Sequence, residues 1–366
     1  MSGAADQDVM SNPARPGGWV RLAVQSLGFL VGLGLLVWCG YSVFSRPEAR
    51  EQLSRLTAAS WQQIAGLLAL SGATIVFGGL MFWAVVRPVR RTGALDQIAV
   101  NGVCTVLGYV PFKLSFIFRV VYQNRREGMP LLFIGGWMAA CAAVIVACLA
   151  PPVVMSLLLK RVDALWWAGS VGGVALAGAA LVIGGRWASS PGGRAWIGRA
   201  AAAVRLGAVA RSEGFGRLME GCAMLADWRA TFGGLALRGL DVAAQAARFW
   251  LGAGIIGAAI TPDQAILAGA TYFLLQVLAP TGVGGVREAG TAGVLGFLGQ
   301  DIMVVVLAVS AGEAVMNLVF GAVGAAWLRV DRLLSRRGVG PAAGAGSRPV
   351  RSEHAVGARA DQPDGR

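Results

Sequence analysis

The sequence predicts an all-α polytopic membrane protein, and three observations support this fold class. Of the 366 residues, 56% are hydrophobic and only 14% are charged. Four uncharged runs each exceed the ~20 residues that a helix needs to cross ~30 Å of hydrocarbon: 22–45, 56–86, 128–159 and 164–185. A further apolar segment is broken at 279–285 by one proline and three glycines, which indicates non-helical backbone at membrane depth.

The chain divides into a membrane domain and two polar ends. The stretch 1–18 is expected to be disordered, 19–330 to form the transmembrane domain, and 331–366 to be a disordered basic tail. Within the domain, 45–60 is predicted to be an amphipathic connector and 186–230 a cytoplasmic helical loop at the lipid headgroups.

About eight apolar segments predict about six spanning helices and two re-entrant helical hairpins. The segments 95–112 and 263–299 are too interrupted by glycine and proline for ordinary spans, so each is interpreted as a hairpin that returns to its own side. The first hairpin is expected to end in a basic loop at 119–128. The crossings are expected at 19–44, 61–86, 131–159, 165–185, 231–260 and 302–328.

The distribution of basic residues predicts the topology. If both broken segments are re-entrant, one side collects the arginines at 87–91, the basic residues of 113–126, the 186–230 loop and the tail. The opposite side has only Arg46, Arg50, Arg55, Lys160 and Arg161. The positive-inside rule then makes both termini cytoplasmic. The two hairpins enter from opposite sides, which predicts an inverted repeat with a site near the midplane.

Composition excludes several functional classes. The net charge of +13 does not indicate nucleic-acid binding, because the positive charges lie between and after apolar segments, as orientation signals do. The five cysteines show no ligand spacing, and the single histidine, His354, stands in the polar tail. No metal site, cofactor or histidine-based catalytic triad is therefore expected.

The break near residue 280 is the strongest functional signal. Gly284 and Gly285 are followed by Arg287 and Glu288, and the chain is helix-compatible again from Ala289. Since broken backbone in hydrocarbon must line a cavity, this turn is expected to deliver a helix N-terminus into that cavity. Such a terminus suits a phosphate or a carboxylate. Glu288 alternatively complements the helix dipole in the first turn.

Other charged residues inside predicted crossings have two interpretations. Arg238, Asp241 and Arg248 share one helix face, and three unpaired charges there would cost ~7–10 kcal/mol. They form either a structural ion pair or a wall of the substrate cavity. The same two interpretations, a structural ion pair or a cavity wall, apply to Glu313 in the last crossing. Lys113 and Arg119, which follow the first break, are either positive-inside anchors or contacts to a headgroup phosphate.

Two motifs resemble the lysylphosphatidylglycerol synthase transmembrane region, also called the flippase-like domain family. The first family pattern is a proline, a basic residue two positions on, Gly then Glu, and an arginine before a basic loop. Lys113 and Arg119 match it after Pro111, whereas Ser115 and Phe116 replace the glycine and the acid. The second pattern, a proline, a Gly-Gly turn and Arg-Glu-Ala-Gly, is matched by Pro280, Gly284, Gly285, Arg287, Glu288, Ala289 and Gly290.

The resemblance covers roughly 20–329, and Glu313 stands where the family often has a basic residue in the last crossing. The resemblance implies translocation or handling of an anionic lipid, and a fold with re-entrant hairpins around a central cavity. Members that synthesise lysyl lipids carry a large soluble domain after the membrane part. This sequence has only about 35 residues there, so no enzymatic activity is expected.

The leading hypothesis is a lipid translocator in the inner membrane of a bacterium. Its partner would be a phospholipid or a polyprenyl-phosphate-linked lipid, with no nucleic acid. The hypothesis leaves open a homo-oligomer or a partner from envelope-lipid biosynthesis. A second hypothesis is a non-transporting scaffold of a hopanoid or glycolipid pathway. A third, a membrane-embedded transferase, would need Asp241, Glu288 or Glu313 as its general base.

Overall fold

The computed structural model describes 18–110, 113–203, 213–278, 285–297 and 302–330. The predictions for 1–18 and 331–366 therefore fall, apart from Gly18, outside the described residues. One compact unit ends at Arg329 and a second begins at Val330. In the described ranges every regular element is a helix: α1 (Gly18–Ser45), α2 (Pro47–Thr57), α3 (Trp61–Val86), α4 (Ala94–Leu107), α5 (Leu114–Glu127), α6 (Leu131–Leu159), α7 (Ala164–Ser189), α8 (Pro191–Ala203), α10 (Glu213–Ala226), α11 (Trp228–Ile256), α12 (Pro262–Leu278), α13 (Val286–Phe297) and α14 (Met303–Leu328).

Four of these helices, α3, α6, α7 and α14, are long and apolar enough to cross a membrane. A fifth candidate is the pair formed by α1 and α2, which is bent by 93°. Large apolar side chains on these helices point outward, and Leu158 of α6 and Leu176 of α7 are 71% and 74% exposed. Whole helices with uncovered apolar faces are typical of lipid contact. The all-helical class is thus confirmed for the described residues, and the apolar helices are consistent with a multi-pass membrane protein.

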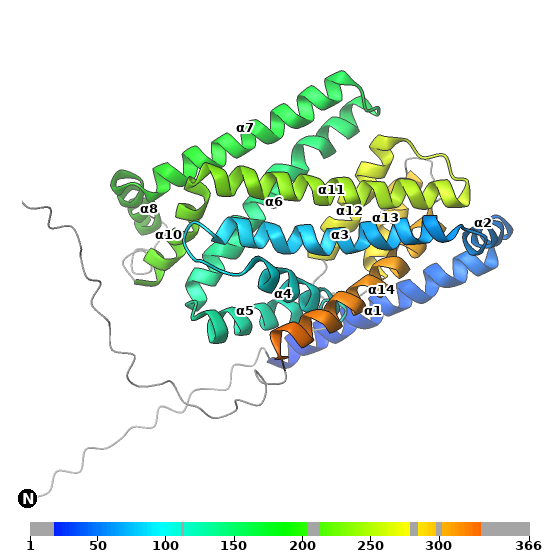
Figure 1. Cartoon of the computed structure of the whole chain (residues 1–366), viewed down its shortest axis with the longest axis horizontal. Helices are drawn as coiled ribbons and strands as arrows, with labels where there is room; N and C mark the ends of the chain where they lie inside the picture. The colour runs from blue at the N-terminus through cyan, green and yellow to red at the C-terminus, as the bar shows by residue number, and fades with distance from the viewer. Residues whose placement is uncertain (1–17, 111–112, 204–212, 279–284, 298–301, 331–366) are drawn as a thin grey trace, which may run out of the picture. The chain divides into compact units, whose positions relative to one another are not determined.

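The long helices α3 and α11 lie side by side, and α4 packs against both α3 and α14 (Figure 1). The packing of α4 depends on glycine. A Cβ atom added to Gly102 would lie 2.7 Å from the carbonyl oxygen of Phe320 in α14, which is closer than atoms can approach without backbone movement. The absence of a side chain at Gly102 therefore lets two helix backbones touch, as small residues do in membrane helix pairs.

Both segments that the sequence marks as broken are broken in the structure. The first consists of α4 and α5, which are separated by a turn at 108–110 and by two residues outside the described part. The second consists of α12 and α13, which are separated by 279–284, also outside it. Helix α1 packs on α13. At that contact Gly285 has a φ of +103°, and a Cβ atom on it would lie on the carbonyl oxygen of Gly32.

One sequence expectation is wrong. The stretch 119–128 was expected to be a basic loop, but 114–127 form helix α5, and Arg119, Tyr122 and Gln123 are buried in it. The amphipathic period explains the difference. These three residues lie on one face, whereas Arg125 and Arg126 point outward. The described parts of 186–230, which exclude 204–212, are mostly helical, since they contain α8 and α10, and α10 packs against α6 and α7.

Replacing Gly102 with alanine should lower stability, because the new methyl group meets backbone atoms that cannot rotate away. We expect a loss of about 1–3 kcal/mol, measured as a lower thermal unfolding temperature in detergent. Gly172 of α7 is the matched control, since an added Cβ atom there meets nothing within 4 Å and alanine is the better helix former. An unfolding temperature of Gly102→Ala at or above that of Gly172→Ala would contradict this packing.

Candidate functional site

A cavity of about 580 Å³ lies between the two broken helix pairs and the long helices beside them. Its volume falls in the range of small-molecule sites. Residues of α3, α4, α5, α6, α11, α12, α13 and α14 line it. Most of the predicted site residues meet on its wall: Lys113, Arg119, Arg238, Asp241, Arg287 and Glu313.

Three other predicted residues, Arg248, Gly285 and Glu288, are buried behind the cavity lining. Arg248 and Glu288 bond to the lining residues Glu313 and Arg287, and Gly285 bonds to Glu288. Gly284 lies outside the described residues, as does Pro280. The structure thus brings six predicted residues together around one cavity, although the first and the last of them, Lys113 and Glu313, are 200 positions apart in the sequence.

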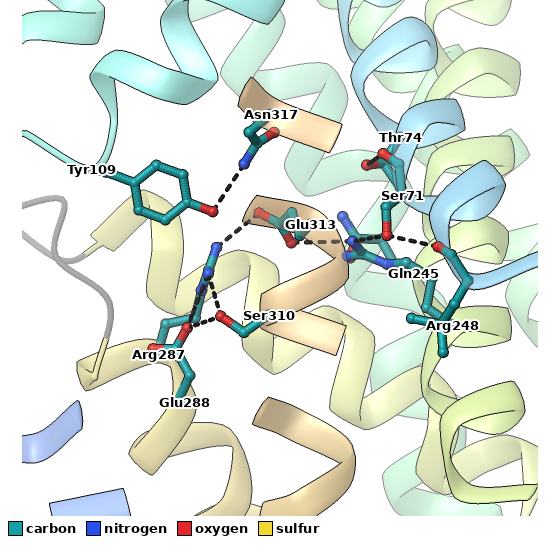
Figure 2. A network of polar contacts seen from close by, with 11 residues as sticks. Ser71, Thr74, Tyr109, Gln245, Arg248, Arg287, Glu288, Ser310, Glu313 and Asn317 are labelled. Atoms are coloured by element: carbon teal, nitrogen blue, oxygen red, sulfur yellow. Dashed lines mark hydrogen bonds and ion pairs between the residues drawn. The ribbon is translucent and has the colours of Figure 1, made fainter. Parts of the chain in front are cut away.

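Arg287, at the start of α13, lies at the centre of a polar network (Figure 2). Its Nη1 donates to Glu313 at 2.8 Å, and its Nε and Nη2 donate to Glu288 at 3.1 and 2.9 Å. Nη2 also donates to Ser310 at 3.1 Å. The guanidinium lies 4.1 Å from the ring centroid of Tyr272, which is cation–π contact. Each of the three guanidinium nitrogens therefore donates a hydrogen bond to a protein acceptor.

Glu313 links this group to a second arginine. Its other carboxylate oxygen accepts from Arg248 Nη1 at 3.1 Å, and Arg248 also donates to Gln245 and to Ser71. Ser71 belongs to α3, Arg248 to α11, Glu313 to α14 and Arg287 to α13, so the contacts tie four helices together (Figure 2). The side chain of Arg248 is 0% exposed.

Glu288 connects the network to the break itself. Its carboxylate accepts the backbone N–H of Gly285 and the hydroxyl of Ser310. The bond to Gly285 has the form of the glutamate half of a capping box. It satisfies one of the N–H groups that a helix start leaves open. The expected dipole role of Glu288 thus coexists with its ion pair to Arg287.

These four ions, Arg248, Arg287, Glu288 and Glu313, form what we call the four-charge network. Two positive and two negative groups balance, so the network as a whole carries no net charge. That balance matters because an unpaired charge at a membrane helix centre costs ~2.5–3.5 kcal/mol or more. Neutrality explains how four ionisable groups can be buried together in α11, α13 and α14.

A separate ion pair joins Arg238 and Asp241, one turn apart on α11. The two side chains are buried, and both line the cavity. Arg238 stacks on Phe273 of α12, with its guanidinium carbon 3.6 Å from the ring centroid. Among the described residues, Arg238 Nε, Arg238 Nη2 and Asp241 Oδ1 have no hydrogen-bond partner.

Arg119 of α5 has a different environment. It is 4% exposed, donates through Nη2 to Asn101 at 2.9 Å and stacks on Phe82 at 3.8 Å. Asn101 is fixed in turn by its bond to the backbone oxygen of Ile75. Within the described part of the chain, no acidic side chain forms an ion pair with Arg119, and its Nη1 has no hydrogen-bond partner.

Lys113 lines the same cavity as Arg119 and follows directly after the first break. It is the N-cap residue of α5 and adopts a left-handed conformation, with φ +52° and ψ +38°. A non-glycine residue in this region costs energy. Its side chain is exposed and lines the cavity. The local backbone therefore presents a lysine where a glycine would be easier to place.

Sequence reasoning did not find several partners in the site. Tyr109 accepts from Asn317 at 3.0 Å and thereby joins the first break to α14. Tyr272, Ser310 and Asn101 also contact the arginines. Uncharged polar residues in apolar helices were the available signal, but their pairing depends on how distant helices pack. No group of three or more potential metal ligands occurs among the described residues.

No protein-family model matches the chain, and no curated protein or solved structure matches it either. The fold and the cavity therefore carry the functional argument by themselves.

Breaking the four-charge network should destabilise the protein. Arg287→Gln leaves Glu288 and Glu313 with one arginine, and loss of one partner from a buried ion pair costs about 3–5 kcal/mol. The double variant Arg287→Gln/Glu313→Gln restores neutrality and should lose less than the sum of the two single variants. Thermal unfolding in detergent measures all three. Additive losses would mean that the charges are not coupled.

Proposed function

We propose that this chain is a membrane lipid translocator whose central cavity binds the phosphate-bearing headgroup of an anionic lipid. The observation that carries the proposal is Arg119, a buried cation on the cavity wall that has no acidic partner among the described residues and has a free Nη1. An anion is the group that would compensate this charge. Arg119 supplies planar donors for phosphate oxygens.

Lys113 and α5 strengthen the same assignment. Lys113 adds a second cation to the cavity wall, and α5 begins at Leu114 with its N-terminal end beside it. A helix N-terminus and two cations favour one negative group together. The phosphate is therefore assigned to Arg119 and Lys113. Arg287, which follows the break that is the strongest functional signal in the sequence, already has Glu288 and Glu313 as partners.

Transport, rather than binding alone, is supported by the arrangement of the breaks. The order long helix, short helix, break, short helix, long helix occurs twice, in α3–α6 and in α11–α14. The helix lengths are 26, 14, 14 and 29 residues in the first copy and 29, 17, 12 and 26 in the second. This repetition favours an inverted repeat with two oppositely re-entrant hairpins, as in transporters that alternate access around a central site.

The proposed placement follows from charge. Arg87, Arg90 and Arg91 follow α3, and Arg125 and Arg126 end α5. The positive-inside rule puts these residues and both termini on the cytoplasmic side of a bacterial inner membrane. About six spans result, if α1 and the charged α11 are counted with the four apolar helices. The resemblance to the flippase-like domain family belongs to the same proposal.

A non-transporting scaffold is the second candidate. It is favoured by the basic surface of α8, where Arg194, Arg199 and Trp196 are exposed and suit anionic headgroups or an acidic partner. A scaffold needs no central anion site, so the cavity variants below discriminate between the two candidates.

Replacing Arg119 with glutamine should slow lipid movement. In proteoliposomes, we expect the rate of flipping of a fluorescent anionic phospholipid to fall at least about tenfold, because one charge-assisted contact to phosphate is lost. Arg119→Lys should retain part of the rate, since the cation stays. Arg125→Gln is the matched control on the exposed face of α5. Equal rates for Arg119→Gln and wild type would overturn the assignment.

Two single cysteines test the topology in a background without the five native cysteines. Arg125 and Thr261 are both exposed. If α4 and α5 form a re-entrant hairpin, Arg125→Cys should react only from the cytoplasmic side and Thr261→Cys only from outside. If the pair spans the membrane instead, both assignments reverse. Labelling by a membrane-impermeant maleimide in intact cells and in lysed cells reads out the result.

A further inference from the structure

The pair formed by Arg238 and Asp241 has features that a purely structural ion pair does not need. The two residues are 3% and 2% exposed and both line the cavity. One contact joins them, while Arg238 Nε, Arg238 Nη2 and Asp241 Oδ1 have no hydrogen-bond partner among the described residues. Two donors and one acceptor are thus buried without partners among the described residues, which is unfavourable unless another group binds them.

The charge balance of the pair restricts what it can recognise. A second phosphate would be attracted by Arg238 but repelled by the carboxylate of Asp241. An amine would be attracted by Asp241 but repelled by Arg238, in a cavity whose lining already contains Arg119 and Lys113. A hydroxyl group carries no charge and both donates and accepts, so it satisfies the two members of the pair together. Neighbouring hydroxyls would use all three free atoms.

We propose that Arg238 and Asp241 form a subsite for the hydroxyl groups of the lipid headgroup, so that the substrate is a phospholipid or lipid phosphate bearing a polyol or a sugar. This inference rests on the proposed function, because it takes the phosphate to lie at Arg119 and Lys113. The ring of Phe273, from α12, contacts the Arg238 guanidinium. The amide of Gln245, one turn beyond Asp241, also lines the cavity and extends the row of polar groups.

Two synthetic lipids isolate the hydroxyl groups. Dioleoylphosphatidylglycerol and dioleoylphosphatidylmethanol carry the same acyl chains and the same phosphodiester charge, and only the first has headgroup hydroxyls. Dissociation constants for the purified full-length chain in detergent can be measured by native mass spectrometry. We expect phosphatidylglycerol to bind about tenfold more tightly, which corresponds to one or two net hydrogen bonds.

The double variant Arg238→Met/Asp241→Leu removes the donors and the acceptor and keeps the site neutral. Such replacements of buried pairs are often tolerated. It should bind both lipids within about twofold of each other, at the wild-type affinity for phosphatidylmethanol. Arg119→Gln should instead weaken both lipids equally and preserve their ratio. If the double variant does not fold, the wild-type ratio of the two lipids decides the question.

The possible failures are distinguishable. Equal affinity of the wild type for the two lipids would overturn the hydroxyl subsite and leave the anion site intact. Tighter binding of dioleoylphosphatidylethanolamine than of phosphatidylglycerol would also overturn it, because the subsite would then prefer an amine. Binding of neither anionic lipid above the level of dioleoylglycerol would contradict the proposed function itself.

Discussion

The compensation of buried charge is the constraint on which this structure depends. In hydrocarbon a charged side chain must meet an opposite charge, a polar group or a wet cavity. The four-charge network meets this requirement by balancing Arg248 and Arg287 against Glu288 and Glu313 across three helices. Because the partners come from different helices, the ion pairs also fix where α13 lies relative to α11 and α14.

The same constraint explains why the chain can be broken inside its apolar part. The start of α13 exposes backbone N–H groups, and lipid cannot satisfy them. Glu288 accepts one of them from Gly285, while α1 lies so close that its Gly32 carbonyl excludes any side chain at Gly285. Helix α1 therefore has two faces. One packs against Gly285 at the start of α13, and the other, with Val37 and Trp38 more than half exposed, is suited to lipid.

Local patterns predicted the fold class and much of the site, because hydropathy and helical period are properties of neighbouring residues. The bounds of α3 and α6 agree with the expected crossings, and the shared face of Arg238, Asp241 and Arg248 follows from their spacing. The spacing does not show which charges pair. Arg248 pairs with Glu313 of α14 rather than with Asp241 of its own helix, and that choice depends on the packing of α14. Likewise, the burial of Arg119 depends on Phe82 and Asn101, which precede it by 37 and 18 positions.

The presence or absence of an acidic partner also distinguishes arginines that look equivalent in the sequence. Arg248 and Arg287 are neutralised by carboxylates, so an incoming phosphate would have to displace Glu313 or Glu288 and leave that acid buried without a partner. Arg238 is neutralised by Asp241. Arg119 contacts the amide oxygen of Asn101 and the face of Phe82 and forms no ion pair with any acidic side chain of the described residues, so a phosphate there would add a counter-charge and displace none of them. This argument favours Arg119, the arginine of the weaker sequence motif, as the proposed anion ligand, whereas Arg287, the arginine of the stronger motif, ties the start of α13 to α14.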